Sequence, residues 1–315
     1  MKYLHTEENF LGIEGEDNYS YNNATFVIQS LPYEYTSSYL MGSAKGPKAI
    51  IKASQFVELY DEELDAEPYK KAGICTLKPL KFGKAVDAEA VKLIEESTAQ
   101  LLADKKFVVS LGAEHTVSYG LVKAHAAKHK NLTVLQLDAH SDLREAYHDN
   151  PYSHASVMKR VHDMGVNLVQ AGIRAQCIEE AELIKKSKNI HTFYAHYIRK
   201  NESTWIDEAL AAMTDNVYIT IDADGFDPSI MPAVGTAEPN GLFWNESLEL
   251  LRRTIMEKNV VGFDIVECAP MKGTILSEYT LAKLAYRLMG YITLKPKAKA
   301  KTAAAPAKKS TTRKK

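Results

Sequence analysis

The chain has 315 residues, 45% of them hydrophobic, which is enough for one large α/β domain with a sizeable core. Its 39 basic and 40 acidic residues nearly balance, but nine of the basic residues lie after Leu294, where there is no acid, so residues 1–294 are clearly acidic. The opening MKYLHTEENF has acids where a signal peptide needs an apolar run, and no stretch approaches the roughly 20 apolar residues of a membrane span. These features argue against a membrane protein, and we expect a cytoplasmic one.

Eight apolar, β-branched runs recur along the chain and predict strands. In chain order they span residues 24–32, 74–80, 107–111, 132–137, 168–173, 190–194, 217–221 and 260–265. Helical patterns lie between most of them, at 87–102, 117–128, 155–164 closed by Gly165, 204–213 and 246–258, and a final helix is expected at roughly 278–292. Strands that are apolar on both faces and alternate with helices predict a three-layer α/β/α sandwich with a mainly parallel sheet of about eight strands.

The predicted elements form one domain, followed by a basic tail. No Pro-, Gly- or Ser-rich linker divides residues 1–293, which we interpret as a single domain. Residues 294–315 are rich in Lys, Ala and Pro and contain no aromatic side chain, so we expect them to be disordered. Clustered lysines can contact nucleic acid non-specifically. The alternative is a solvated tail with no part in catalysis.

The three cysteines are Cys75, Cys177 and Cys268, which are widely spaced along the chain. An odd number at such spacings argues against a disulfide framework. We therefore expect three buried thiols that pack as small hydrophobic side chains.

Polar side chains follow three of the predicted strands. Two aspartates and a histidine stand at alternate positions after 132–137, two more aspartates follow 217–221, and a histidine follows 107–111. Alternate side chains of a strand share a face, and open parallel sheets bind ligands beyond the carboxyl ends of their strands. These six residues are His115, Asp138, His140, Asp142, Asp222 and Asp224.

We expect these six side chains to bind metal. A single aspartate after a strand is more often a turn or helix-capping residue, but six in register at three strand ends are not explained in that way. Four carboxylates in one crevice raise each other's pKa unless cations neutralise them, and two divalent ions would cancel the four charges. Carboxylates and imidazoles without a thiolate suit Mn, Co, Fe, Ni or Zn better than Mg, Ca or a structural zinc, and Mn²⁺ is our first choice.

Five segments carry a family resemblance: LGAEHTVSYG, LDAHSDLRE, YSHAS, ITIDADGFDP and GFDIVECAP. In order and spacing they resemble the signature segments of the ureohydrolase (arginase/agmatinase) family, and the chain looks most agmatinase-like. The first segment more often reads GGDHS, so Ala113, Glu114 and Thr116 depart from the family pattern without changing His115. The resemblance implies an arginase-like fold, a trimer or hexamer, and a binuclear metal centre.

Carried over by position, the resemblance also implies a ligand set for each metal ion. The first set is His115, Asp138, Asp142 and Asp222. The second set is Asp138, His140, Asp222 and Asp224.

The resemblance further implies hydrolysis of a guanidino group to urea and an amine. Two metal ions would lower the pKa of a water molecule toward about 7, which supplies hydroxide at neutral pH. His154, in the YSHAS segment, is the candidate proton carrier for the leaving amine, with His148 as the alternative. Glu267 would hold the planar guanidinium with two parallel hydrogen bonds, unless it instead pairs with a neighbouring arginine.

Agmatine, which would give putrescine, is the first candidate substrate. Arginases carry an asparagine two residues after the third metal-binding aspartate, where this chain has Arg144, so arginine is a weaker candidate. Glu145 could receive the ammonium of agmatine, whereas Arg144 could pair with the carboxylate of guanidinobutyrate or guanidinopropionate. In MPAVGTAEPNGLFW, Ala237 and Asn240 replace a more common Pro and Gly.

Two other classes of protein remain possible. A single-zinc, deacetylase-like amidohydrolase would need fewer carboxylates than this sequence offers. A non-catalytic protein could act through nucleic acid bound to the basic tail.

Overall fold

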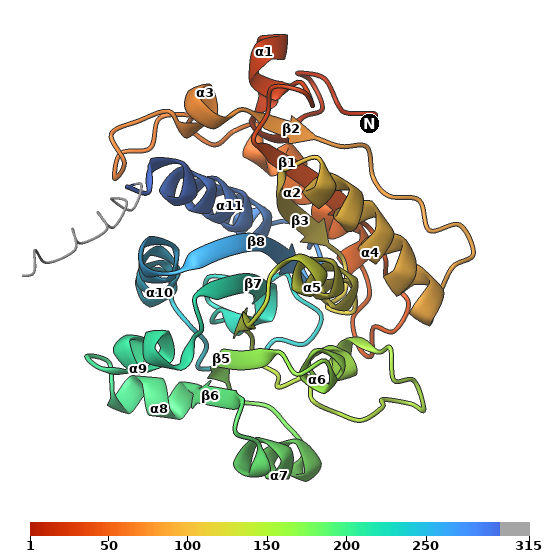
Figure 1. Ribbon diagram of the computed structural model, residues 1–315, viewed down its shortest axis with the longest axis vertical. Coiled ribbons are helices and arrows are strands. Elements are labelled where there is room, and N and C mark those ends of the chain that lie inside the picture. The colour runs from red at the N-terminus through yellow and green to blue at the C-terminus, as the bar shows by residue number, and fades with distance from the viewer. Residues whose placement is uncertain (297–315) are drawn as a thin grey trace, which may run out of the picture.

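The structure, a computed structural model, describes residues 1–296, which contain one eight-stranded sheet (Figure 1). The strand order is β2-β1-β3-β8-β7-β4-β5-β6, and neighbouring strands are parallel. The predicted α/β/α fold with a parallel sheet is confirmed. The strands are β1 (Phe26–Leu31), β2 (Ile74–Thr76), β3 (Phe107–Gly112), β4 (Leu132–Leu137), β5 (Asn167–Ile173), β6 (Ile190–Tyr194), β7 (Asn216–Asp222) and β8 (Asn259–Val266).

Helices cover both faces of the sheet (Figure 1). One face carries α2 (Gly46–Ser54), α3 (Pro68–Ala72), α8 (Ala195–Lys200), α9 (Trp205–Ala212), α10 (Trp244–Glu257) and α11 (Leu276–Leu294). The other face carries α4 (Asp87–Ala103), α5 (Val117–Lys128), α6 (Val157–Asp163) and α7 (Ile178–Lys186). The short elements are α1 (Glu16–Tyr19) and the 3-10 helices η1 (Phe10–Gly12), η2 (Ser43–Lys45), η3 (His154–Ser156) and η4 (Ala223–Gly225).

The strands are apolar on both faces because each face packs against a helical layer. In β4, Leu135 and Leu137 belong to the core under α10 and α11, whereas Leu132 and Val134 belong to the core under α5 and α6. Each of these side chains is buried, and burial of one such side chain stabilises the fold by about 1.5–3 kcal/mol. The strands thus form a rigid platform for the polar residues that follow them.

Several predicted boundaries were wrong. The predicted strand 74–80 ends at Thr76, because Pro79 has no N–H to donate to the ladder and the segment lies at the sheet edge. The predicted strand 24–32 covers only Phe26–Leu31, and the predicted helix 155–164 is divided between η3 and α6. Helices α2, α3, α7 and α8, which have five to nine residues each, were not predicted.

Helix α11 continues to Leu294, the first residue of the predicted tail. The rest of that tail, from residue 297 on, lies outside the described residues. Within residues 1–296, no helix combines the length and the apolar character that crossing a membrane requires.

Candidate metal centre and active site

Four central strands, β3, β8, β7 and β4, end side by side. Their register pairs Leu111 with Ile265, Ile265 with Ile221, and Ile221 with Leu137, so these residues form one row across the sheet. Every predicted metal ligand, and Glu267, follows this row within five residues along the chain. The sheet therefore brings together polar residues that are up to 152 positions apart in the sequence, the separation of His115 and Glu267.

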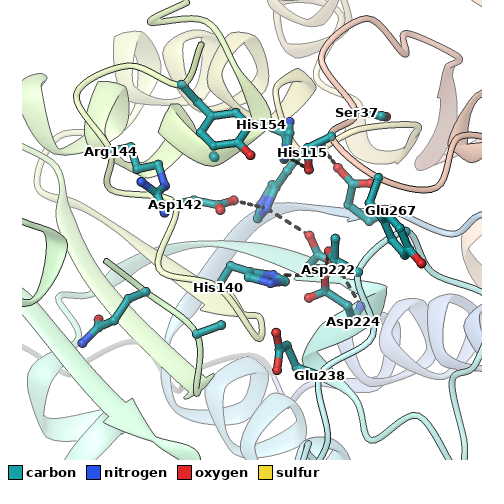
Figure 2. A pocket seen from close by; sticks show the side chains of 18 of the residues that line it. Ser37, His115, His140, Asp142, Arg144, His154, Asp222, Asp224, Glu238 and Glu267 are labelled. Carbon is teal, nitrogen blue, oxygen red and sulfur yellow. Dashed lines mark hydrogen bonds and ion pairs between the residues drawn. The ribbon is translucent and has the colours of Figure 1, made fainter. Parts of the chain in front are cut away.

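His115 is surrounded by three of the predicted ligands. Its Nδ1 lies 3.1 Å from Asp138 Oδ2, 3.0 Å from Asp142 Oδ2 and 3.2 Å from Asp222 Oδ2, and all four side chains are buried. Figure 2 shows Asp142 and Asp222 directed at His115 from opposite sides. The ligand atoms of His115, Asp138 and Asp142 lie within 4.8 Å of one another, close enough to share one ion.

His140 marks a second group beside the first. Its Nδ1 lies 3.1 Å from Asp224 Oδ2 and 3.7 Å from Asp138 Oδ1. The ligand atoms of Asp138, His140 and Asp224 also lie within 4.8 Å of one another. Asp138 belongs to both groups, which is the arrangement that two neighbouring ions require.

The motif spacing has a local cause. The carboxylate of Asp138 accepts the N–H of His140 (2.6 Å), and the carboxylate of Asp222 accepts the N–H of Asp224 (2.9 Å). Aspartate commonly accepts the N–H two residues on, which turns the chain directly after the strand. A Cβ on Gly225 would lie 2.7 Å from the backbone nitrogen of Asp138, so only glycine permits the two turns to approach each other.

The environment of His115 fits a cation. Its Nε2 contacts Thr220 Oγ1 at 2.9 Å, whereas its buried Nδ1 makes no hydrogen bond although carboxylates surround it. Thr220 in turn donates to the fully buried carboxylate of Asp264 at 2.7 Å. Outer hydrogen bonds of this kind fix the orientation of a metal-binding imidazole. The donor set of oxygen and nitrogen atoms without sulfur suits a divalent metal ion other than a structural zinc.

The charges of the cluster are strongly coupled. Burial lowers the pKa of His140, but the carboxylates of Asp224 and Asp138 outweigh it and raise that pKa to about 12. Burial and the negative charge of Asp138 raise the pKa of Asp142 to about 7. Burial and the charges of Asp224 and Asp138 also hold the pKa of Asp222 well above its usual range. Without metal ions, protons must neutralise these carboxylates, and divalent cations would replace those protons.

A cavity of about 360 Å³ opens over this cluster (Figure 2). Glu267, which is half-buried, lines it from the end of β8, with Oε1 accepting the N–H of His115 at 2.7 Å. Burial and the nearby carboxylate of Glu114 raise the pKa of Glu267 well above its usual range. Glu267 has no ion pair with an arginine of the described residues, so the alternative of a simple salt bridge is not observed. The residue sits at φ 61°, a conformation that costs energy for a non-glycine residue and is concentrated at functional sites.

His154 lines the same cavity and begins η3. Burial lowers its pKa to about 4, and positive charge on His115 and His140 contributes to the shift. The alternative, His148, is exposed and does not line the cavity. Of the two candidates, only His154 is therefore placed to exchange a proton with a bound ligand.

The comparisons with known proteins agree with this geometry. The arginase family model matches residues 24–291. N(1)-aminopropylagmatine ureohydrolase of Synechocystis sp. is 43% identical over 285 residues, 89% of this chain and 92% of the relative, and agmatinase of Bacillus cereus is 36% identical over 261 residues, 80% and 86%. The crystal structure of agmatine ureohydrolase of Thermoplasma volcanium matches with a TM-score of 0.78 at 29% identity, covering 90% of this chain and 94% of that one.

The chain belongs to the arginase family. This membership confirms the expected class of enzyme, a metal-dependent amidinohydrolase that acts on guanidino groups, and the arginase-like fold.

Two expectations about this arginase-family enzyme were wrong. Glu145 does not face the cavity: its carboxylate pairs with Arg160 at 2.8 Å and Lys159 at 2.9 Å on α6. The sequence could not show this, because the direction of the loop depends on those cations. Cys177 is only partly buried, since it lies at the N-terminus of α7, while Cys75 and Cys268 are buried as expected.

Sequence analysis missed other residues of the cavity. Glu238 lies in a segment whose resemblance was noted, but its acidic side chain was not singled out. Residues 37–40 also line the cavity, although they lie in an irregular loop without a periodic pattern. Asn240, where the family more often has glycine, adopts φ 65°, which asparagine tolerates better than most residues.

Proposed function

We propose that the enzyme hydrolyses a guanidino compound with a cationic amine tail, agmatine or N(1)-aminopropylagmatine, to urea and an amine. The observation that carries this choice is Glu238, whose carboxylate lines the cavity without an ion pair to any described residue. Its backbone carbonyl accepts Arg174 Nη2 at 2.9 Å, and the same nitrogen donates to the carbonyl of Asp224 at 2.6 Å. Arg174 thus ties the backbone of Glu238 to that of Asp224, which supports a role for the Glu238 carboxylate beside the proposed metal centre.

A substrate with a carboxylate tail is the second candidate, because Arg144 also lines the cavity. Its guanidinium lies 5.4 Å from the ring centroid of Tyr147, a cation–π contact. Arg144 and Glu238 lie on opposite sides of His140 in Figure 2. A guanidino acid such as guanidinobutyrate would use Arg144, whereas a diamine tail would use Glu238. The relatives named for amine-tailed substrates favour Glu238.

For the cofactor, we propose two divalent ions, with Mn²⁺ as the first choice, held by the two groups of ligands around His115 and His140. When bound, they would lower the pKa of a water molecule toward about 7 and so supply hydroxide at neutral pH. The predicted set of His115, Asp138, His140, Asp142, Asp222 and Asp224 supports this proposal by its proximity, burial and charge.

The remaining roles fall to Glu267 and His154. Glu267 holds the guanidinium, because a carboxylate matches the two parallel N–H groups of that planar cation and fixes its carbon in the cavity. Hydrolysis breaks the bond from this carbon to the substituted nitrogen, and the departing amine must gain a proton. His154 carries that proton: with a pKa of about 4 it is neutral at pH 7, so it can first accept a proton and then release it to the amine.

We further propose a cytoplasmic homo-oligomer, a trimer or hexamer, whose catalytic domain spans residues 1–293. The three free cysteines support a reducing compartment. Four clustered carboxylates argue against a single-zinc, deacetylase-like enzyme. Contact of the basic tail with nucleic acid has no support from the relatives.

A substrate panel tests the proposal. Manganese-loaded protein is assayed for urea release from agmatine, N(1)-aminopropylagmatine, arginine, guanidinobutyrate and guanidinopropionate. We expect the highest kcat/KM for an amine-tailed compound. Preference for a guanidino acid would replace the first candidate by the second, and absence of urea from all five would refute both.

A further inference from the structure

The loop of residues 34–42, which follows β1 and reaches the cavity, is held by two carboxylates. Glu34 accepts the N–H groups of Gly42 (2.6 Å) and Ser43 (3.1 Å) and so closes the base of the loop. Glu114, fully buried after β3, accepts the N–H groups of Tyr35 (2.9 Å) and Thr36 (2.7 Å) with Oε2. Charged acceptors make the stronger class of hydrogen bonds. The first residues of the loop are therefore fixed to the strand end that carries His115.

Thr36, held in this way by Glu114, also contacts His154. Its Oγ1 accepts the backbone N–H of His154 at 3.0 Å and lies 3.0 Å from Nδ1 of the same ring. A hydroxyl has one donor and two acceptor positions, so one Thr36 oxygen can serve both contacts. Nδ1 is thereby engaged, and Nε2, whose one polar neighbour is Ser38 Oγ at 3.5 Å, is left to exchange a proton in the cavity.

We propose that Thr36 and Glu114 are positioning residues that hold the imidazole of His154 in its proton-transfer orientation. The inference rests on the proposed role of His154 and assigns a task to two residues that do not line the cavity. Glu114 acts through the backbone of Thr36, and Thr36 acts on the ring and the backbone of His154. The side chain of His154 also lies near Ser153 Oγ, 3.4 Å from Nδ1, and Ser38 Oγ, 3.5 Å from Nε2, and the ring of Tyr147 is 5.8 Å away between centroids. The contact with Thr36, at 3.0 Å, is the shortest polar contact of the ring.

The consequence is a specific defect in proton delivery. Without the Thr36 hydroxyl, Nδ1 loses its nearest partner and keeps only the longer contact with Ser153 Oγ at 3.4 Å, so the ring can rotate away from the departing amine. A displacement of about 1 Å at such a group can cost on the order of 100-fold in rate. Substrate binding should change little, because the guanidinium and the tail are held by other residues, Glu267 and Glu238.

Thr36→Val tests this, since valine keeps the shape of the side chain and removes the hydroxyl, and Thr36→Ser is the matched conservative variant. We expect Thr36→Val to lower kcat for agmatine by about 10- to 100-fold with KM within a factor of about two and metal content unchanged, and Thr36→Ser to restore most of the turnover. Glu114→Ala should give a defect of the same kind.

A change of leaving group separates proton delivery from a general structural defect. In the guanidinooxy analogue of agmatine, oxygen replaces the methylene next to the guanidino group, so the departing alkoxyamine is far less basic and needs less help from an acid. We expect Thr36→Val to slow the analogue at least about tenfold less than agmatine. Equal slowing of the two substrates, or a rise in KM alone, would overturn the proposal.

Crystal structures of the metal-loaded variants decide the positioning without any assay. The ring of His154 should be displaced or rotated in Thr36→Val and unchanged in Thr36→Ser. An unmoved ring in Thr36→Val would overturn the inference whatever the substrate. If instead His154→Ala hydrolyses agmatine as fast as the wild type, the proposed role of His154 in proton transfer is refuted. The position of the His154 ring in Thr36→Val still shows whether Thr36 holds that ring.

Discussion

Substituting Glu238 by glutamine should reduce the preference of the enzyme for agmatine over guanidinobutyrate. The change keeps the size of the side chain and removes its charge, and no described residue provides an ion pair that the change would break. A hydrogen bond to a charged group contributes about 1.5–3 kcal/mol. Glu238 is half-buried, so the lower part of that range applies, and at about 1.4 kcal/mol per factor of ten kcat/KM for agmatine should fall about 10- to 30-fold. Guanidinobutyrate, whose carboxylate is repelled by Glu238, should be hydrolysed as fast or faster.

The assay is urea release from both substrates by the wild type, Glu238→Gln and Glu145→Gln. Glu145→Gln is the matched control, because it makes the same chemical change at a glutamate that pairs with α6 outside the cavity. The control should keep the wild-type ratio of kcat/KM for the two substrates. An equal loss of both activities in Glu238→Gln would show that Glu238 supports the fold rather than the amine tail, and would refute the reasoning.

Three further predictions concern the metal centre and the proton carrier. His154→Ala should lower kcat by about 10²- to 10⁴-fold with metal content unchanged. The control His148→Ala, which changes a residue outside the cavity, should retain turnover. Loss of metal from His154→Ala would instead indicate that His154 is a metal ligand. Thr220→Val removes the partner of His115 Nε2 and should weaken metal affinity by about 10- to 100-fold in a chelator competition, and unchanged affinity would contradict the orienting role. Metal binding should release protons and strengthen as pH rises, because the pKa of His140 is raised to about 12 without ions and a ligating imidazole must be neutral. Calorimetry in two buffers of different ionisation enthalpy measures the number of protons released on metal binding. A count of zero would refute the prediction.

The sheet and the clustering of the six candidate metal ligands were predictable because their signals are local. The central strands are buried on both faces and are therefore mostly apolar, and each candidate ligand lies within five residues of a strand end. The spacing in LDAHSD and DADG follows from carboxylates that accept the N–H two residues on. Parallel pairing then brings the strand ends together without further information from the sequence.

The surroundings of the ligands were not predictable, because they depend on contacts between distant segments. Thr36 meets His154 across 118 positions, and Glu114 meets Thr36 across 78, from a loop that has no regular pattern. Glu145 follows a predicted ligand closely, yet two cations on α6 turn it away from the cavity. The directions of these side chains depend on their tertiary contacts, whereas the buried strands can be recognised from their runs of apolar residues.

The central claim is that six clustered side chains hold two divalent ions for hydrolysis of a guanidinium. Its most direct test is to measure the metal content of manganese-loaded protein together with its urea release. The account predicts two ions per chain in the wild type and in His154→Ala, and the loss of ions and activity together in Asp138→Ala, whose carboxylate belongs to both groups. A single ion per chain, or full activity of Asp138→Ala, would contradict it.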